Sequence, residues 1–123
     1  MKTIQIRNIT IGEGRPKICV PVVGQTEEDI LREAAGLVSL PVDVVEWRAD
    51  WFQDVFDIEK VLHTAKALRS ALGELPLLFT FRTAKEGGEK EISAEAYRKL
   101  NLTLAASGLV DLIDVELCPE MSW

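Results

Sequence analysis

The sequence predicts an α/β fold with a parallel sheet, and three observations support this. Four short, nearly all-apolar segments follow one another along the chain. One amphipathic segment separates each from the next, so the strands run parallel and the helices cover them. Right-handed crossovers then leave either an open doubly wound sheet or an arc of a closed (β/α) barrel. The sequence Val-Val-Gly-Gln-Thr after the first strand matches no glycine-rich nucleotide-binding loop, which weighs against a nucleotide-binding open sheet.

Composition limits the chain to one globular domain over residues 1–123. The 123 residues are 47% hydrophobic, which is enough for one core and excludes a disordered chain. The net charge of -6 makes nucleic-acid binding improbable. No apolar run reaches the roughly 20 residues that cross a bilayer, so we expect no membrane association.

The cysteines favour a cytoplasmic protein. Cys19 and Cys118 fit neither a metal-ligand spacing nor a disulfide framework. We therefore expect two reduced core thiols, no metal site and a cytoplasmic location.

The elements follow from periodicity and from residues that start or stop helices. Isoleucines at 4, 6, 9 and 11 predict a small N-terminal hairpin. Thr26 begins a helix whose first turn is acidic, as favours the helix N-terminus. Gly73 and Gly108 end two later helices. We predict strands over residues 17–23, 42–48, 77–82 and 110–117, and later helices over about 57–72 and from the Ser93 cap to Gly108.

Charged residues occur on strands that otherwise read as buried, and they share one parity. Side chains alternate between the two faces of a strand, so each strand has one apolar face and one face that becomes polar toward its carboxyl end. Buried charges cost several kcal/mol unless they are paired with an opposite charge or serve to bind a ligand. A structural ion-pair network would explain any one of them, but their shared parity on successive strands favours a site. The residues are Glu46, Arg48, Arg82, Asp114 and Glu116.

The two arginines indicate an anionic or polyhydroxylated ligand, because a guanidinium holds a carboxylate through two hydrogen bonds. The loop over residues 83–89 lies at the same end of the sheet, and Lys85 and Glu86 could reach a ligand there. For Lys85, Glu89 and Lys90 we favour a solvated, charged loop.

Three segments carry a family resemblance. Glu46-Trp-Arg48 with Ala-Asp50, then residues 77–89 (Leu-Leu-Phe-Thr-Phe-Arg-Thr-Ala-Lys-Glu-Gly-Gly-Glu), then residues 107–117 together resemble type I 3-dehydroquinate dehydratase. The resemblance covers residues 1–117 and implies a (β/α)8 TIM barrel. In this reading residues 1–14 are an N-terminal hairpin that closes the barrel bottom, residues 15–117 are the first four β/α units (a half-barrel), and residues 118–123 are a divergent tail.

The resemblance also implies an activity, a lyase reaction that removes water from 3-dehydroquinate in the shikimate pathway. Such enzymes use no metal or organic cofactor. A lysine forms a Schiff base with the substrate ketone, and a histidine moves protons. On the family pattern, Glu46, Arg48 and Arg82 bind substrate, and Glu86 supports the catalytic histidine. On the same pattern Asp114 and Glu116, on the fourth strand beneath the pocket, count among the substrate-binding residues.

The family's Schiff-base lysine and catalytic histidine belong to the second half of its barrel, so we expect this chain to be inactive alone. His63, the one histidine, reads as an ordinary helix residue. An alternative is a non-catalytic carboxylate-binding half-barrel that self-associates, as a homodimer or larger, through its open edges. A response-regulator-like domain is a weaker reading, because Arg48 and Arg82 do not suit its acidic site.

Overall fold

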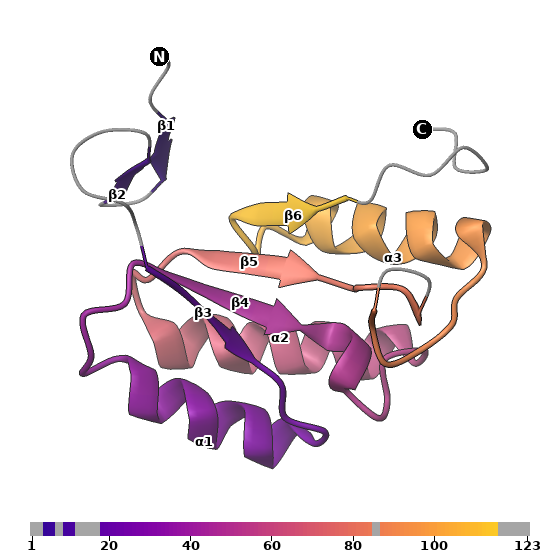
Figure 1. Cartoon of the computed structure of the whole chain (residues 1–123), viewed down its shortest axis with the longest axis horizontal. Coiled ribbons are helices and arrows are strands. Elements are labelled where there is room, and N and C mark those ends of the chain that lie inside the picture. The colour runs from indigo at the N-terminus through magenta and orange to yellow at the C-terminus, as the bar shows by residue number, and fades with distance from the viewer. Residues whose placement is uncertain (1–3, 7–8, 12–17, 85–86, 116–123) are drawn as a thin grey trace.

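A four-stranded parallel sheet, in the order β3-β4-β5-β6, forms the body of the computed structural model (Figure 1). The structure describes residues 4–6, 9–11, 18–84 and 87–115. The three helices follow the strands in alternation, and α2 contacts both α1 and α3. A separate antiparallel pair, β1 and β2, forms its own two-stranded sheet before β3 in the chain (Figure 1). This arrangement confirms the predicted parallel α/β fold and the N-terminal hairpin.

Every predicted element is present, and the strands are shorter than predicted. The ladder between β4 and β5 ends at Arg48 and Thr80. Two residues later, the Arg82 backbone N–H donates to the Asp50 carboxylate. Lys17, Glu116 and Leu117 lie outside the described residues. The elements are β1 (Ile4–Ile6), β2 (Ile9–Ile11), β3 (Cys19–Val22), α1 (Glu27–Leu37), β4 (Val44–Arg48), the 3₁₀ turn η1 (Ala49–Trp51), α2 (Ile58–Leu72), β5 (Leu77–Thr80), α3 (Ala94–Ser107) and β6 (Leu112–Asp114).

The helices begin at the caps that the sequence predicts. The Thr26 hydroxyl accepts a hydrogen bond from the Asp29 N–H at 3.2 Å, and the Ser93 hydroxyl accepts one from the Ala96 N–H at 3.1 Å. Each side chain satisfies a backbone donor that the helix leaves unpaired. None of the described helices has the length and apolar character needed to cross a membrane.

The core lies between the helices and the face of the sheet that was predicted to be apolar. Trp47, Phe79 and Phe81 are fully buried on this face, and the rings of Trp47 and Phe79 meet edge to face with centroids 5.4 Å apart. Aromatic pairs in this geometry add to the free energy gained by burying apolar area. The core therefore fixes which face of each strand is left for polar side chains.

Two aspartates hold the end of the sheet where the strands begin. The Asp43 carboxylate accepts the Ile18 N–H at 2.7 Å, and the Asp111 carboxylate accepts the Leu77 N–H at 2.8 Å. Asp111 also pairs with Arg69 at 2.9 Å. In each case the residue just before one strand accepts a backbone N–H at the start of the neighbouring strand, and this contact helps to fix the relative position of the two strands.

Two glycines on the helices are expected to respond oppositely to alanine. Gly108 ends α3 with φ +75°, a conformation that strains residues with a Cβ, so Gly108→Ala should lower the free energy of unfolding by about 1 kcal/mol. Gly36 lies within α1, where a Cβ meets no atom within 4 Å, so Gly36→Ala should raise it by roughly 0.5–1 kcal/mol. Urea unfolding followed by circular dichroism measures both, and two shifts of the same sign would contradict the assignment.

Candidate active site

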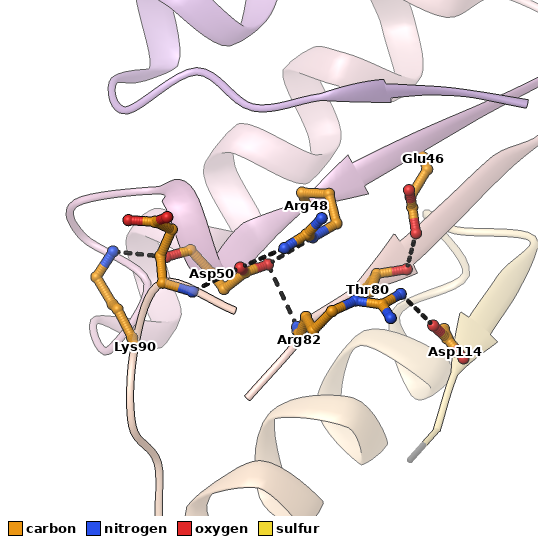
Figure 2. Close-up of polar contacts among 8 residues, drawn as sticks. Glu46, Arg48, Asp50, Thr80, Arg82, Lys90 and Asp114 are labelled. Atoms are coloured by element: carbon orange, nitrogen blue, oxygen red, sulfur yellow. Dashed lines mark hydrogen bonds and ion pairs between the residues drawn. The ribbon is translucent and has the colours of Figure 1, made fainter. Parts of the chain in front are cut away.

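The polar side chains gather where β4, β5 and β6 end (Figure 2). In the parallel register Arg48 lies opposite Thr80, and Thr80 lies opposite Asp114. These three residues form one row across the sheet, on the face opposite the aromatic core. In parallel α/β folds this end of the sheet forms the binding face. Glu46, Arg48 and Asp114 therefore lie on the same face of the sheet, as their alternation along the strands predicts.

Thr80 is a site residue that the sequence analysis did not single out. Its side chain is buried, and its hydroxyl donates to Glu46 Oε2 at 2.8 Å. This hydrogen bond ties the Glu46 carboxylate to the central strand of the row. Among the described residues nothing donates to the other carboxylate oxygen, Oε1, so it can accept a hydrogen bond from a ligand.

Asp50 is the second residue that the sequence analysis missed, and it organises the site. Its side chain is fully buried and accepts four hydrogen bonds (Figure 2). Oδ1 accepts from Arg48 Nε at 3.0 Å and from the Arg82 backbone N–H at 3.3 Å. Oδ2 accepts from Arg48 Nη2 at 2.8 Å and from the Glu89 backbone N–H at 3.1 Å. Each oxygen is thus shared between a guanidinium and the loop after β5.

These contacts keep Asp50 ionised. Burial raises the pKa of Asp50, but the Arg48 hydrogen bonds and the backbone N–H groups of Glu89 and Arg82 outweigh burial, so the pKa lies below its ordinary value. The hydrogen bonds to Asp50 in turn raise the pKa of Arg48. The pair is a buried, charge-assisted fork-to-fork contact of the kind that gives geometric precision.

Arg82 is bound less completely than Arg48. Its Nη2 lies 3.4 Å from Asp114 Oδ2, and its side chain is 38% exposed. Its Nε is buried and, within the described part of the chain, has no hydrogen-bond partner. A buried N–H without an acceptor is costly, so Arg82 is the guanidinium with a donor to offer to a ligand.

The loop after β5 folds back on itself beside Asp50. The Gly88 N–H donates to the Thr83 carbonyl at 2.8 Å, and a Cβ on Gly88 would lie 1.8 Å from the Arg82 carbonyl oxygen. Only glycine fits this approach. Lys90 Nζ donates to the Asp50 carbonyl at 2.7 Å, so the prediction of a merely solvated Lys90 is wrong. The Glu89 side chain is exposed, and Lys85 lies outside the described residues.

The structure therefore places four of the six predicted site residues on one face, Glu46, Arg48, Arg82 and Asp114. Glu86 and Glu116 lie outside the described residues. Both arginines of this face are in ion pairs, Arg48 with Asp50 and Arg82 with Asp114. One sequence signal could have indicated Asp50. It is a carboxylate within the otherwise apolar segment Ala-Asp-Trp-Phe, two residues after Arg48.

Two other singled-out residues lie away from this row. His63 Nδ1, on α2, is 2.7 Å from Glu27 Oε1, and this contact lowers the pKa of Glu27. His63 therefore links α2 to α1 as a helix residue. Cys19 is a free thiol and is exposed, so the prediction of a core thiol is wrong. Cys19 lies on β3, an outer strand of the sheet, and its side chain shares the face of Glu46.

Comparison with known proteins decides the family. The family profile described as type I 3-dehydroquinase matches residues 18–122. The chain belongs to this family. A 3-dehydroquinate dehydratase of Clostridium botulinum is 57% identical over 116 residues, and one of Clostridioides difficile is 52% identical. Each match covers 94% of this chain and 46% of the relative, so the chain spans about half the length of the curated relatives it matches and corresponds to their N-terminal half.

Solved structures of the family match the fold. The crystal structure of a type I 3-dehydroquinate dehydratase from Clostridium difficile, with covalently modified comenic acid, aligns with a TM-score of 0.93 over 94% of this chain and 46% of that one. The enzyme from Geobacillus kaustophilus aligns with a TM-score of 0.91 at 44% identity. The predicted half of a (β/α)8 barrel is thereby confirmed.

The buried Asp50 carboxylate gives stability a pH dependence. Because its folded pKa lies below the ordinary value of 3.8, its contribution is complete above about pH 4 and is lost as the pH falls through the lowered pKa. Asp50→Asn should lower the free energy of unfolding by about 3 kcal/mol near neutral pH. The difference from the unmodified chain should shrink below about pH 4. Urea unfolding across this pH range measures it, and a pH-independent difference would rule out this carboxylate as the cause.

Proposed function

We propose that this chain provides half of a 3-dehydroquinate dehydratase active site, the half that binds the substrate's oxygen atoms. The observation that carries the proposal is the row of polar side chains at the carboxyl ends of β4, β5 and β6 in a chain of this family. Glu46, Arg48 and Arg82 bind the substrate, and Asp114 supports Arg82 from the neighbouring strand.

The proposed reaction removes water from 3-dehydroquinate to give 3-dehydroshikimate. A lysine amine condenses with the substrate ketone, and the resulting iminium accepts electron density when the adjacent C–H loses its proton. A histidine removes this proton and delivers one to the departing hydroxyl, which leaves as water. On the family pattern both residues belong to the half of the relatives that this chain does not cover. On the same pattern Glu86 supports the histidine, and Glu116 belongs with Asp114 to the substrate-binding residues.

The charge balance of the described residues favours hydroxyl groups as their ligands. Glu46, Asp50 and Asp114 oppose Arg48, Arg82 and Lys90, so the negative and positive charges of these described residues balance. Such a cluster does not attract an anion by net charge. It offers both acceptors and donors, as a polyhydroxylated ring requires. We place the protein in the cytoplasm, where the free Cys19 thiol stays reduced.

Binding of quinate, a stable relative of the substrate, tests this role. The chain should bind quinate weakly, and Arg82→Gln should reduce the affinity by about tenfold or more, because a charged hydrogen-bond donor is lost. Arg32→Gln is the matched control, since Arg32 pairs with Glu28 and Asp29 on the exposed side of α1. Isothermal titration calorimetry measures both variants.

The same preparation should produce no 3-dehydroshikimate absorbance from 3-dehydroquinate, and borohydride should trap no substrate adduct. Equal quinate affinity in the Arg82 and Arg32 variants would refute the binding role. Turnover or a trapped adduct would refute the assignment of the chemistry to residues beyond this chain.

We also propose that copies of this chain self-associate, as a homodimer or larger assembly. Within the described strands, β3 and β6 each have one neighbour, so each leaves backbone groups unpaired along its outer edge. Ile18, next to β3, is 44% exposed. In the simplest arrangement β3 of one copy pairs with β6 of the other about a two-fold axis.

Light scattering tests the association. The mass should rise with concentration above the 13.7 kDa of one chain, and Ile18→Lys should return it toward one chain by placing a charge at the edge. Leu102→Lys is the control, because Leu102 is 51% exposed but lies on α3. A mass of one chain at all concentrations would contradict the proposal.

A further inference from the structure

We propose that Asp50 is a positioning residue that joins Arg48 to the loop after β5, so that guanidinium and loop meet a ligand as one unit. The proposal rests on the proposed function only for the identity of that ligand. The link between Arg48 and the loop follows from the structure alone, because both donate hydrogen bonds to the same buried carboxylate.

The first argument is the orientation of Arg48. Asp50 holds the edge formed by Nε and Nη2, so the guanidinium keeps one plane and presents its remaining donors in a fixed direction. The Arg48 side chain is 18% exposed, which leaves little room for another rotamer. Without Asp50 the same long side chain would have several orientations and would lose conformational entropy on binding.

The second argument is the attachment of the loop. The carboxylate accepts the N–H of Arg82, where the loop begins, and the N–H of Glu89, near its end. Lys90 Nζ adds a third contact, to the Asp50 carbonyl. The loop cannot leave this position without exposing or unpairing a buried carboxylate, and that cost is large.

The third argument is that both sets of contacts use the same two oxygens. Each carboxylate oxygen accepts one hydrogen bond from Arg48 and one from the loop. A change at Arg48 therefore alters the carboxylate that accepts from the loop, and a change in the loop alters the carboxylate that accepts from Arg48. Coupling of this kind is reciprocal, so the loop should respond to Arg48 and Arg48 to the loop.

Nuclear magnetic resonance of the full chain tests the link between Arg48 and the loop directly. The unmodified chain should show a slowly exchanging Arg48 Nε–H signal and a protected Glu89 amide. Asp50→Asn should accelerate exchange at both groups by about tenfold or more, because a charge-assisted acceptor is lost. Asp54→Asn is the matched control. It removes the same charge from a partly exposed carboxylate that contacts Lys60 at 3.8 Å, and it should leave both signals unchanged.

A second variant keeps the test decisive if Asp50→Asn does not fold. Arg48→Gln should also accelerate exchange of the Glu89 amide, although Arg48 hydrogen-bonds the carboxylate and not that amide. An unchanged Glu89 amide in a folded variant of either kind would overturn the proposal. Equal acceleration of hydrogen exchange at core amides such as Phe79 would also overturn it, because this would indicate general destabilisation and not the loss of one local link.

Added quinate separates this proposal from the proposed function. In the unmodified chain quinate should shift the Arg48 Nε–H and Glu89 amide signals together, and in Asp50→Asn it should shift the Arg48 signal alone. A joint shift in both proteins would overturn the positioning role. If quinate does not bind the unmodified chain, the ligand assignment fails, while the exchange measurements still decide the role of Asp50.

Discussion

The structure of the binding face depends on one buried carboxylate. Asp50 lies in the turn after β4, fully removed from solvent, where an ionised group is tolerated only if its oxygens are saturated with donors. Two of its donors come from Arg48, on the strand just before it, and two come from backbone groups 32 and 39 residues later. The electrostatic requirement of Asp50 thus determines where β4 and β5 stop pairing and where the next loop begins. Backbone that would otherwise continue the ladder is used to satisfy a charge.

The opposite end of the sheet uses the same chemistry for a purely structural purpose. Asp43 and Asp111 accept backbone N–H groups at the start of the neighbouring strand, from Ile18 just before β3 and from Leu77 of β5. Backbone donors at the ends of strands must be satisfied like those at the ends of helices. The difference between the two ends lies in the second partner. At the amino end Arg69 pairs with Asp111 and also donates to the backbone carbonyls of Gly73 and Leu75. At the carboxyl end the Arg82 side chain is 38% exposed and, among the described residues, its Nε has no hydrogen-bond partner, so this guanidinium has donors left for a ligand.

Sequence reasoning predicted the strands, helices and apolar face because these follow from periodicity and local capping, as Thr26 and Ser93 show. The parity of Glu46, Arg48, Arg82 and Asp114 also placed these residues on one face. Their partners could not be predicted in the same way. Asp50 lies in a 3₁₀ turn, outside any strand, so no alternation rule applies to it. Thr80 is a good strand former, and its role depends on a contact to Glu46, which is 34 residues away.

Pairing the arginines with acids changes what the proposed site can recognise. A guanidinium pair without acidic partners would be mobile, and binding would first have to order it. Arg48 is already ordered by Asp50, and Arg82 is partly ordered by Asp114, so little reorganisation remains when a ligand arrives. The same pairing removes the excess positive charge, and discrimination must then come from the direction of individual donors and acceptors. A fixed geometry of this kind rejects a ligand that lacks a hydroxyl in the right place, because it would leave buried polar groups unpaired.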